Sequence, residues 1–467
     1  MTRALDADQM SALDAAFAGH NLFLTGPAGC GKTYVMRYIV AQLRTAKAKH
    51  VSLVSSTGTA AIVLGGGATT LHAWLALGDP GDKPVAWYTR RLQLPRFAAY
   101  AALMRQTDVL VIDEVPMLTH ELLGLCDAIL RDVRHRPAEP FGGVQCILSG
   151  DFGQLPHVYT GPAPSRNGGK RLLPAGTTHP ADPLFTSVAW RMCAPRTCQL
   201  THPHRQHADT TYATLLTRVR LDQHTDADFA LLKTRLLTTV NAPPAGAPVT
   251  WLVPTRAQAD AINGQQLAKL PAHTEHTYTA VLTCTVRGAH APPTDDRPTD
   301  DRPPKPAETQ RAAYAFMRRN RAAPSIVLRT GARVMLCRNL NVAQGLGNGT
   351  LGIVTGFTDD AWPIIHWDGQ PTPSPVPAST WTCTGDPLWT GTYTQVPVML
   401  AWAMTIHKSQ GATLSRVIAV LPANPSWFGA AYTAMSRVRT LADIWFSPIH
   451  RAAVYANPLV IEYYTAQ

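Results

Sequence analysis

The segment GPAGCGKT at residues 26–33 constrains the fold of this chain more than any other feature of the sequence. It matches the pattern G-x-x-x-x-G-K-[ST], follows the apolar run NLFL and precedes apolar residues at helical spacing. In such a strand–loop–helix unit, backbone N–H groups of the loop and the helix N-terminus face phosphate oxygens. Lys32 adds a positive charge at the β- and γ-phosphates, and the Thr33 hydroxyl can ligate magnesium. The pattern predicts a nucleoside triphosphate site made of Gly26, Pro27, Ala28, Gly29, Cys30, Gly31, Lys32 and Thr33.

Acidic and amide side chains at the ends of two further apolar runs complete the predicted phosphate site. The run VLVIDE ends in Asp113, placed to hold the metal, mostly through water, and Glu114, placed to polarise the attacking water. The run before GDFGQLPHV leads to Gln154, which could bridge the γ-phosphate and that water. The two acids could instead be solvated charges at a strand end, an alternative that the upstream Lys32 disfavours.

Apolar strand-like runs alternate with helical stretches along most of the chain, which favours parallel sheets flanked by helices. One series includes HVSLVSS, TDVLVIDE and VQCILSGD, and a second includes VTWLVPTRAQADAIN, SRVIAVLP and ADIWFSPI. The length of 467 residues also predicts several domains. We expect an α/β fold with a first domain over 1–195, carrying a small wedge insertion near 78–97, and a second domain split between 196–272 and 396–467.

The stretch between the two parts of the second domain, 273–395, has few helical signals and much Pro, Thr and Gly. Its strand-like segments GARVMLCRNL and GTLGIVTGF flank Asn348-Gly349, a hairpin-turn dipeptide, and predict a small inserted SH3-like β-barrel. TDDRP occurs twice in tandem from Thr294, and such a charged, proline-rich segment cannot bury enough apolar surface to order itself. We therefore expect disorder near 290–310.

The net charge, the apolar runs and the cysteine content limit the kinds of binding partner and the cellular compartment that we expect. The net charge of +11 and the pI near 9.4 favour polyanionic partners. No apolar run approaches the ~18 residues of a membrane span, and the first ten residues contain two aspartates where a signal peptide would be apolar. The eight scattered cysteines are typical of buried thiols. We expect an intracellular protein in a reducing compartment, without a membrane partner.

A second possible site is a cluster of metal-ligand residue types within fifteen residues. It consists of Cys193, Cys198, His202, His204 and His207. The spacing C-x4-C-x3-H-x-H lacks the intervening loop or helix that lets four ligands converge on zinc, so zinc is the less favoured interpretation.

The ordered set of motifs resembles the PIF (petite integration frequency) and RecD-like helicases of superfamily 1B. Besides the phosphate-site segments, it includes STGTAA, GATTLHAW, THPHRQ, LVPTRAQADAIN, GARVMLCRNLNVAQGLGNG, AWAMTIHKSQGATL and AYTAMSRVR. The resemblance implies two RecA-like P-loop domains that bind ATP and Mg²⁺. It also implies that Gln9 reads the adenine edge, and that Arg205 and Arg437 reach the γ-phosphate from the second domain. Lys32, Glu114 and Gln154 take the roles given above.

The resemblance further implies positions that contact a nucleic-acid strand: Thr57, Gly58, Thr59, His72, Trp74, Thr405, His407 and Lys408. Hydroxyls, amides and a lysine bind phosphates without reading sequence, and aromatic faces stack on bases. Two alternatives stay open, because Trp74 could be a core aromatic residue and His407 a core histidine.

The sequence therefore predicts an ATP-dependent DNA helicase that moves on single-stranded DNA and unwinds duplex. The resemblance implies 5′ to 3′ movement and work in DNA replication, recombination or repair. Expected partners are single-stranded DNA and tailed or forked duplexes, with RNA left open, and we expect a monomer in the absence of DNA. The alternative is a nucleic-acid-stimulated P-loop ATPase or translocase, acting in recombination or packaging without strand separation.

Overall fold

The computed structural model describes residues 5–77, 85–157, 182–244, 248–286, 323–341, 344–383, 389–422 and 427–466. The first part of the predicted wedge and the whole segment predicted to be disordered near 290–310 lie outside these ranges. Within them, no helix is both long and apolar enough to cross a membrane.

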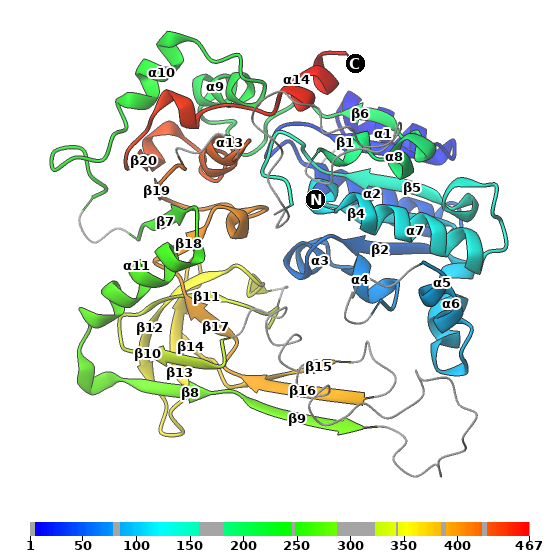
Figure 1. Ribbon diagram of the computed structural model, residues 1–467. Helices are drawn as coiled ribbons and strands as arrows, with labels where there is room; N and C mark the ends of the chain where they lie inside the picture. The colour runs from blue at the N-terminus through cyan, green and yellow to red at the C-terminus, as the bar shows by residue number, and fades with distance from the viewer. Residues whose placement is uncertain are drawn as a thin grey trace, which may run out of the picture.

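A parallel six-stranded sheet forms the first lobe, on the right of Figure 1, with strand order β3-β2-β4-β5-β1-β6. Residues of β4 alternate between two cores, because successive side chains of a strand point to opposite faces. The strands are β1 (Leu22–Thr25), β2 (Val51–Ser55), β3 (Thr69–Thr70), β4 (Val109–Asp113), β5 (Gln145–Ser149) and β6 (Arg196–Gln199). The helices are α1 (Ala7–Phe17), α2 (Lys32–Thr45), α3 (Gly58–Leu64), α4 (Leu71–Trp74), α5 (Val85–Leu92), α6 (Ala98–Gln106), α7 (His120–Val133) and α8 (Val188–Cys193).

Two segments lie with the first lobe although the sequence predicts them in the second domain. Strand β6, just past the expected boundary at residue 195, pairs in parallel with β1 along its whole length. The C-terminal helix α14 (Pro458–Thr465) places Val460 and Tyr464 in the core of the first lobe. Local hydrophobic pattern does not say which sheet a strand joins, so sequence alone could not separate these possibilities.

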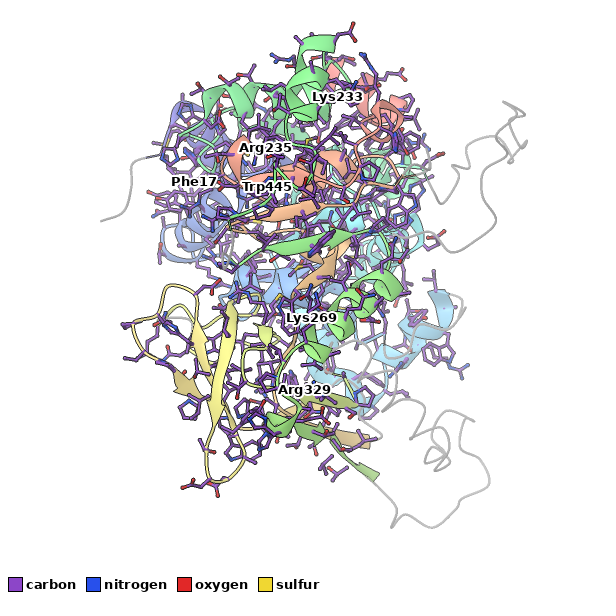
Figure 2. The ribbon with its side chains drawn as sticks, turned by 90° about the vertical axis from the view of Figure 1, so that its left-hand side faces the viewer. Phe17, Lys233, Arg235, Lys269, Arg329 and Trp445 are labelled. Carbon is purple, nitrogen blue, oxygen red and sulfur yellow. The ribbon has the colours of Figure 1, made fainter. Side chains whose placement is uncertain are left out.

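A four-stranded parallel sheet forms the second lobe, at the upper left of Figure 1, with strand order β18-β7-β19-β20. Its strands are β7 (Thr250–Val253), β18 (Ala403–Thr405), β19 (Val417–Ala419) and β20 (Ile444–Phe446). Its helices are α9 (Thr210–Arg220), α10 (Asp226–Lys233), α11 (Arg256–Ala268) and α13 (Ala430–Met435). Arg235, beyond α10, lies 4.6 Å from the ring centre of Trp445 and joins this helix to β20 (Figure 2).

Antiparallel sheets occupy the lower part of Figure 1. The predicted antiparallel pairing is confirmed, because Met335 of β11 lies opposite Leu351 of β12. The turn was predicted wrongly, because the connection runs over 337–350 and Gly349 donates its backbone N–H to the carbonyl of Leu336 at 2.8 Å instead of forming a two-residue turn with Asn348. Arg329 donates to the carbonyls of Leu267 and Leu270 and so fastens this part to the end of α11 (Figure 2). The strands are β8 (His276–Thr279), β9 (Val281–Val286), β10 (Ser325–Leu328), β11 (Arg333–Leu336), β12 (Leu351–Phe357), β13 (Pro363–Trp367), β14 (Ser374–Pro375), β15 (Ser379–Cys383), β16 (Trp389–Gln395) and β17 (Val398–Leu400).

Candidate functional site

The phosphate-binding loop joins β1 to α2, as the sequence predicts. Gly29 and Gly31 both have a φ of +87°, a conformation that glycine adopts without a side-chain clash. A Cβ atom on Gly29 would lie 2.5 Å from the Cβ of Arg205, so the loop also needs glycine for close approach. No side chain caps the first turn of α2 at Gly31, so its N–H groups point into the site.

Lys32 begins α2 and folds back over the loop. Its ammonium group donates hydrogen bonds to the carbonyl oxygens of Gly26, at 2.7 Å, and Pro27, at 3.0 Å. These bonds hold the positive charge above the loop, where a polyphosphate would meet it.

The two predicted acids stand at the end of β4. Asp113 is 6% exposed, and its carboxylate accepts a hydrogen bond from the backbone N–H of Glu114 at 2.9 Å. Glu114 adopts the left-handed conformation, with a φ of 53°, which turns its side chain out of the strand direction. Burial raises the pKa of Asp113. Burial and the neighbouring charge of Asp113 raise the pKa of Glu114 to about 7, against the opposing effect of Lys32. Glu114 therefore titrates in the range where a general base works best.

Two arginines line this edge of the cleft. Arg205 lies against the phosphate-binding loop, where its backbone N–H donates to the carbonyl of Gly29 at 3.2 Å, so it does not reach the site from the second lobe as predicted. Arg437, which follows α13, is 1% exposed, and its guanidinium donates to Gln154 Oε1 at 3.3 Å and to the carbonyl of Thr433 at 2.8 Å. Arg205 donates to the carbonyl of Ser436 at 2.7 Å. Burial and mutual repulsion lower the pKa of Arg437, and burial lowers that of Arg205. The two cations are thus held close together by backbone carbonyls.

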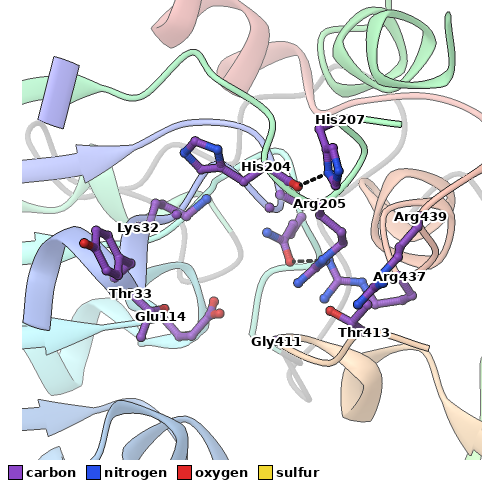
Figure 3. Close-up of a pocket in the computed structure, with 15 residues that line it drawn as sticks. Lys32, Thr33, Glu114, His204, Arg205, His207, Gly411, Thr413, Arg437 and Arg439 are labelled. Carbon is purple, nitrogen blue, oxygen red and sulfur yellow. Dashed lines mark hydrogen bonds between the residues drawn. The ribbon is translucent and has the colours of Figure 1, made fainter. Parts of the chain in front are cut away.

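These groups line one cleft of about 460 Å³ between the lobes (Figure 3). The predicted residues that line it are Ala28, Gly29, Gly31, Lys32, Thr33, Glu114, Gln154, Arg205 and Arg437. Asp113 is buried and is not among the residues that line the cleft, and Cys30 is 1% exposed with its sulfur 3.8 Å from the Lys32 ammonium. Sequence reasoning missed further lining residues: Tyr34, His204, His207, Gly411, Thr413 and Arg439.

Gln9 lies beside the loop rather than inside the cleft. Its backbone and side chain form a capping box with Asp6 at the start of α1. Its side-chain nitrogen is 3.5 Å from His204 Nε2, and the same nitrogen would be 3.5 Å from a Cβ on Gly31. The predicted role of Gln9 in reading adenine stays a prediction.

The predicted strand-contacting residues of the first lobe follow β2 and β3. Thr57 caps α3 and accepts from the backbone of Ala60 at 3.2 Å, Gly58 begins the helix, and the side chain of Thr59 is not among those described. His72 lies on α4. Trp74, on the same helix, is 5% exposed and packs into the first-lobe core. Its surroundings match the core alternative, because a buried ring offers no face to a base.

The predicted strand-contacting residues of the second lobe follow β18. Thr405 ends the strand, and its hydroxyl accepts from the backbone of Lys408 at 3.3 Å. Burial lowers the pKa of His407, whose ring centre lies 5.6 Å from that of Trp427. The structure therefore places two predicted groups on separate lobes, each at the carboxyl end of a parallel strand, where ligands of open α/β sheets bind.

The residues of the alternative zinc cluster are spread over different surroundings. Cys193 packs in one core of the first lobe and Cys198 in the other, on the opposite face of the sheet. His204 and His207 line the cleft instead.

The fold and the site define a P-loop nucleotide-binding protein with two RecA-like lobes. The phosphate-binding loop and the acids come from one lobe, and Arg437 comes from the other.

Comparisons with known proteins place the chain more narrowly. The model of the PIF1-like helicase family matches residues 4–220, and the model of the Pif1 helicase 2B domain matches residues 319–357. The chain is 32% identical to the human ATP-dependent DNA helicase PIF1 over 98% of its own length and 63% of that protein. The chain is similar to PIF1-like helicases over nearly its whole length, and it spans less than two thirds of the length of the first curated relatives that it matches.

Two solved structures of Pif1 helicases superimpose on this chain over its whole length. The crystal structure of Pif1 helicase from Candida albicans superimposes with a TM-score of 0.79 at 27% identity, covering 100% of both chains. Bacteroides Pif1 bound to single-stranded DNA superimposes with a TM-score of 0.66 at 25% identity, covering 100% of this chain and 97% of that one.

Proposed function

We propose that this protein is an ATP-dependent DNA helicase that moves on single-stranded DNA and unwinds duplex. The observation that carries the proposal is the single cleft in which Lys32 and Glu114 of one lobe face Arg437 of the other. The name of the human relative supports ATP and DNA as substrates, and the Bacteroides structure supports binding of a single strand.

The residues at the end of β4 and the start of α2 fit a magnesium ion. Asp113 offers a buried carboxylate and Thr33 a hydroxyl at the same edge of the sheet, and hard oxygen ligands are those that Mg²⁺ prefers. When bound, Mg²⁺ would neutralise charge on the β- and γ-phosphates.

Side chains and backbone groups of the protein bind the phosphates, accept the proton of the attacking water and stabilise the developing charge. Lys32 and the N–H groups at the start of α2 hold the phosphates. Glu114, with a pKa of about 7, accepts the proton of the attacking water while Gln154 orients that water. Arg205 and Arg437 balance the charge that develops on the transferred phosphoryl group. Because Arg437 belongs to the second lobe, hydrolysis depends on closure of the cleft.

Closure of the nucleotide cleft would also change the distance between the strand-contacting residues of the first lobe and those of the second lobe. One group follows β2 in the first lobe and the other follows β18 in the second lobe. Each cycle of cleft closing and opening would therefore move one of these groups along the single strand of DNA. The family resemblance supports 5′ to 3′ movement, and the net charge of +11 supports a polyanionic track. We infer a monomer in the absence of DNA and a reducing intracellular compartment; the six described free cysteines are buried.

Strand displacement from matched duplexes tests the proposal. We expect ATP-dependent displacement from a 5′-tailed duplex, little from a 3′-tailed one, and none with Lys32→Ala. Lys269→Ala, which removes an exposed lysine at the end of α11, is the matched control and should unwind normally. Hydrolysis stimulated by single strands without displacement from either duplex would support the translocase alternative, and an RNA strand in the same assay tests the second nucleic acid.

A further inference from the structure

One tyrosine of the second lobe is bonded directly to the phosphate-binding loop. Tyr432 lies on α13 and is 2% exposed. Its hydroxyl accepts a hydrogen bond from the backbone N–H of Ala28 at 2.7 Å and donates one to Asp151 Oδ2 at 3.0 Å. Ala28 lines the nucleotide cleft, and Asp151 follows β5 in the first lobe.

The protons in this chain of bonds can be assigned in only one way. Asp151 is 1% exposed, and its other carboxylate oxygen accepts from Arg220 Nε at 2.8 Å. Burial alone would raise the pKa of Asp151, but the buried Arg220 charge lowers it, so the carboxylate is ionised and can only accept. Burial raises the pKa of Tyr432, so its hydroxyl keeps its proton and gives it to Asp151. The tyrosine oxygen is then free to accept from Ala28.

Contacts next to Tyr432 fasten α13 to the same first-lobe segment. The Thr433 hydroxyl accepts from the backbone N–H of Leu155 at 2.9 Å. Gly429, just before α13, lies so close to Gly153 that a Cβ atom there would be 2.5 Å from the Gly153 carbonyl oxygen. The start of α13 therefore lies on the segment that carries Gln154, and a movement of the second lobe must strain or break the bond to Ala28.

We propose that Tyr432 is a positioning residue that ties the conformation of the phosphate-binding loop to the separation of the two lobes. The proposal rests on the proposed function, since it explains how nucleotide binding in the cleft changes the affinity for DNA. Such coupling is reciprocal: nucleotide changes DNA affinity by the same factor as DNA changes nucleotide affinity. Tyr432 acts through Ala28 and Asp151 and needs no contact with the substrate.

Tyr432→Phe tests the proposal, because it removes only the hydroxyl oxygen that bonds Ala28 and Asp151 and leaves the other contacts between the lobes in place. Tyr212→Phe is the matched control: Tyr212 is 0% exposed, and its hydroxyl donates to the carbonyl of Met435 at 2.8 Å, entirely within the second lobe. Thermal unfolding compares the stability of the two variants. The main measurement is the affinity for a labelled single-stranded oligonucleotide, with and without a non-hydrolysable ATP analogue, together with the affinity for the analogue with and without DNA.

We expect the wild-type affinity ratio to lie in the range of about 5- to 150-fold that allosteric coupling usually shows. Tyr432→Phe should bring the ratio to within about twofold of one, by the same factor in both directions, while Tyr212→Phe keeps the wild-type ratio. An unchanged ratio in Tyr432→Phe would overturn the inference and leave the proposed function intact.

Hydrogen exchange of α13 with and without ADP tests the same bond without DNA. In the wild type and in Tyr212→Phe, ADP should change the exchange of Ala430–Met435, and in Tyr432→Phe it should not. An equal response in all three proteins contradicts the role of Tyr432. Absence of DNA-stimulated hydrolysis in the wild type would instead refute the proposed function, so the two failures can be told apart.

Discussion

The contact between the phosphate-binding loop and the segment that carries Arg205 can be tested by adding one methyl group. Gly29→Ala places a Cβ atom 2.5 Å from the Cβ of Arg205 and 3.1 Å from Gln206 Oε1, at a residue whose φ is +87°. Gly19→Ala is the matched control, because Gly19 has a φ of +83° and nothing lies within 4 Å of its added Cβ. Both variants place alanine in the left-handed region, and only one meets a neighbour.

The expected magnitudes follow from these two differences. Left-handed backbone costs an L-residue about 1–2 kcal/mol, so Gly19→Ala should lower the free energy of unfolding by that amount. Overpacking adds about 1–3 kcal/mol, so Gly29→Ala should lose about 2–5 kcal/mol unless the Arg205 segment moves away. Such a movement displaces a cation from the cleft and should reduce ATP turnover by about 10²- to 10³-fold, the usual effect of losing one charge-stabilising donor.

Urea unfolding and single-strand-stimulated ATP turnover measure the two effects side by side. We expect Gly19→Ala to lose about 1–2 kcal/mol of stability and to keep its turnover. If Gly29→Ala matches Gly19→Ala in both measurements, the loop and the Arg205 segment are not in contact in solution, and the geometry of the cleft given above is wrong.

The remaining predictions concern Glu114 and Arg437 in the cleft and the predicted strand-contacting residue Lys408. Glu114→Gln should keep ATP binding and lose about 10²- to 10⁴-fold in turnover. Because the raised pKa leaves Glu114 protonated below about pH 7 and a protonated carboxyl group cannot accept the proton, wild-type turnover should rise with pH through that value, as steady-state rates from pH 5.5 to 8.5 would show. Arg437→Lys keeps the charge but loses the planar guanidinium that bonds Gln154 and Thr433, so turnover should fall at least about tenfold while DNA still binds. The logarithm of single-strand affinity should fall with the logarithm of salt concentration by about 0.7 per phosphate contact, and Lys408→Ala should reduce that slope by about 0.7 while Lys269→Ala leaves it unchanged.

Local motifs were enough to predict the chemistry of one side of the cleft. The phosphate-binding loop, Asp113 and Glu114 are fixed by short segments in which a strand ends and a polar residue follows, and this relation depends only on neighbours in the sequence. The two parallel sheets and the antiparallel pairing of β11 with β12 could likewise be predicted from the strand-like apolar runs, whereas the Asn348-Gly349 dipeptide predicted the wrong turn.

The sequence alone thus determined the phosphate-binding loop and the two acids at the end of β4, because the residues of each segment lie close together in the chain and their backbone geometry is local. Only the tertiary structure decided what faces them. Arg437 meets Gln154 across 283 residues, and Tyr432 meets Ala28 across 404 residues. Trp74 is packed into a core, and β6 joins the first sheet. Such contacts depend on how whole sheets pack together, and no local pattern of polar and apolar residues contains that information.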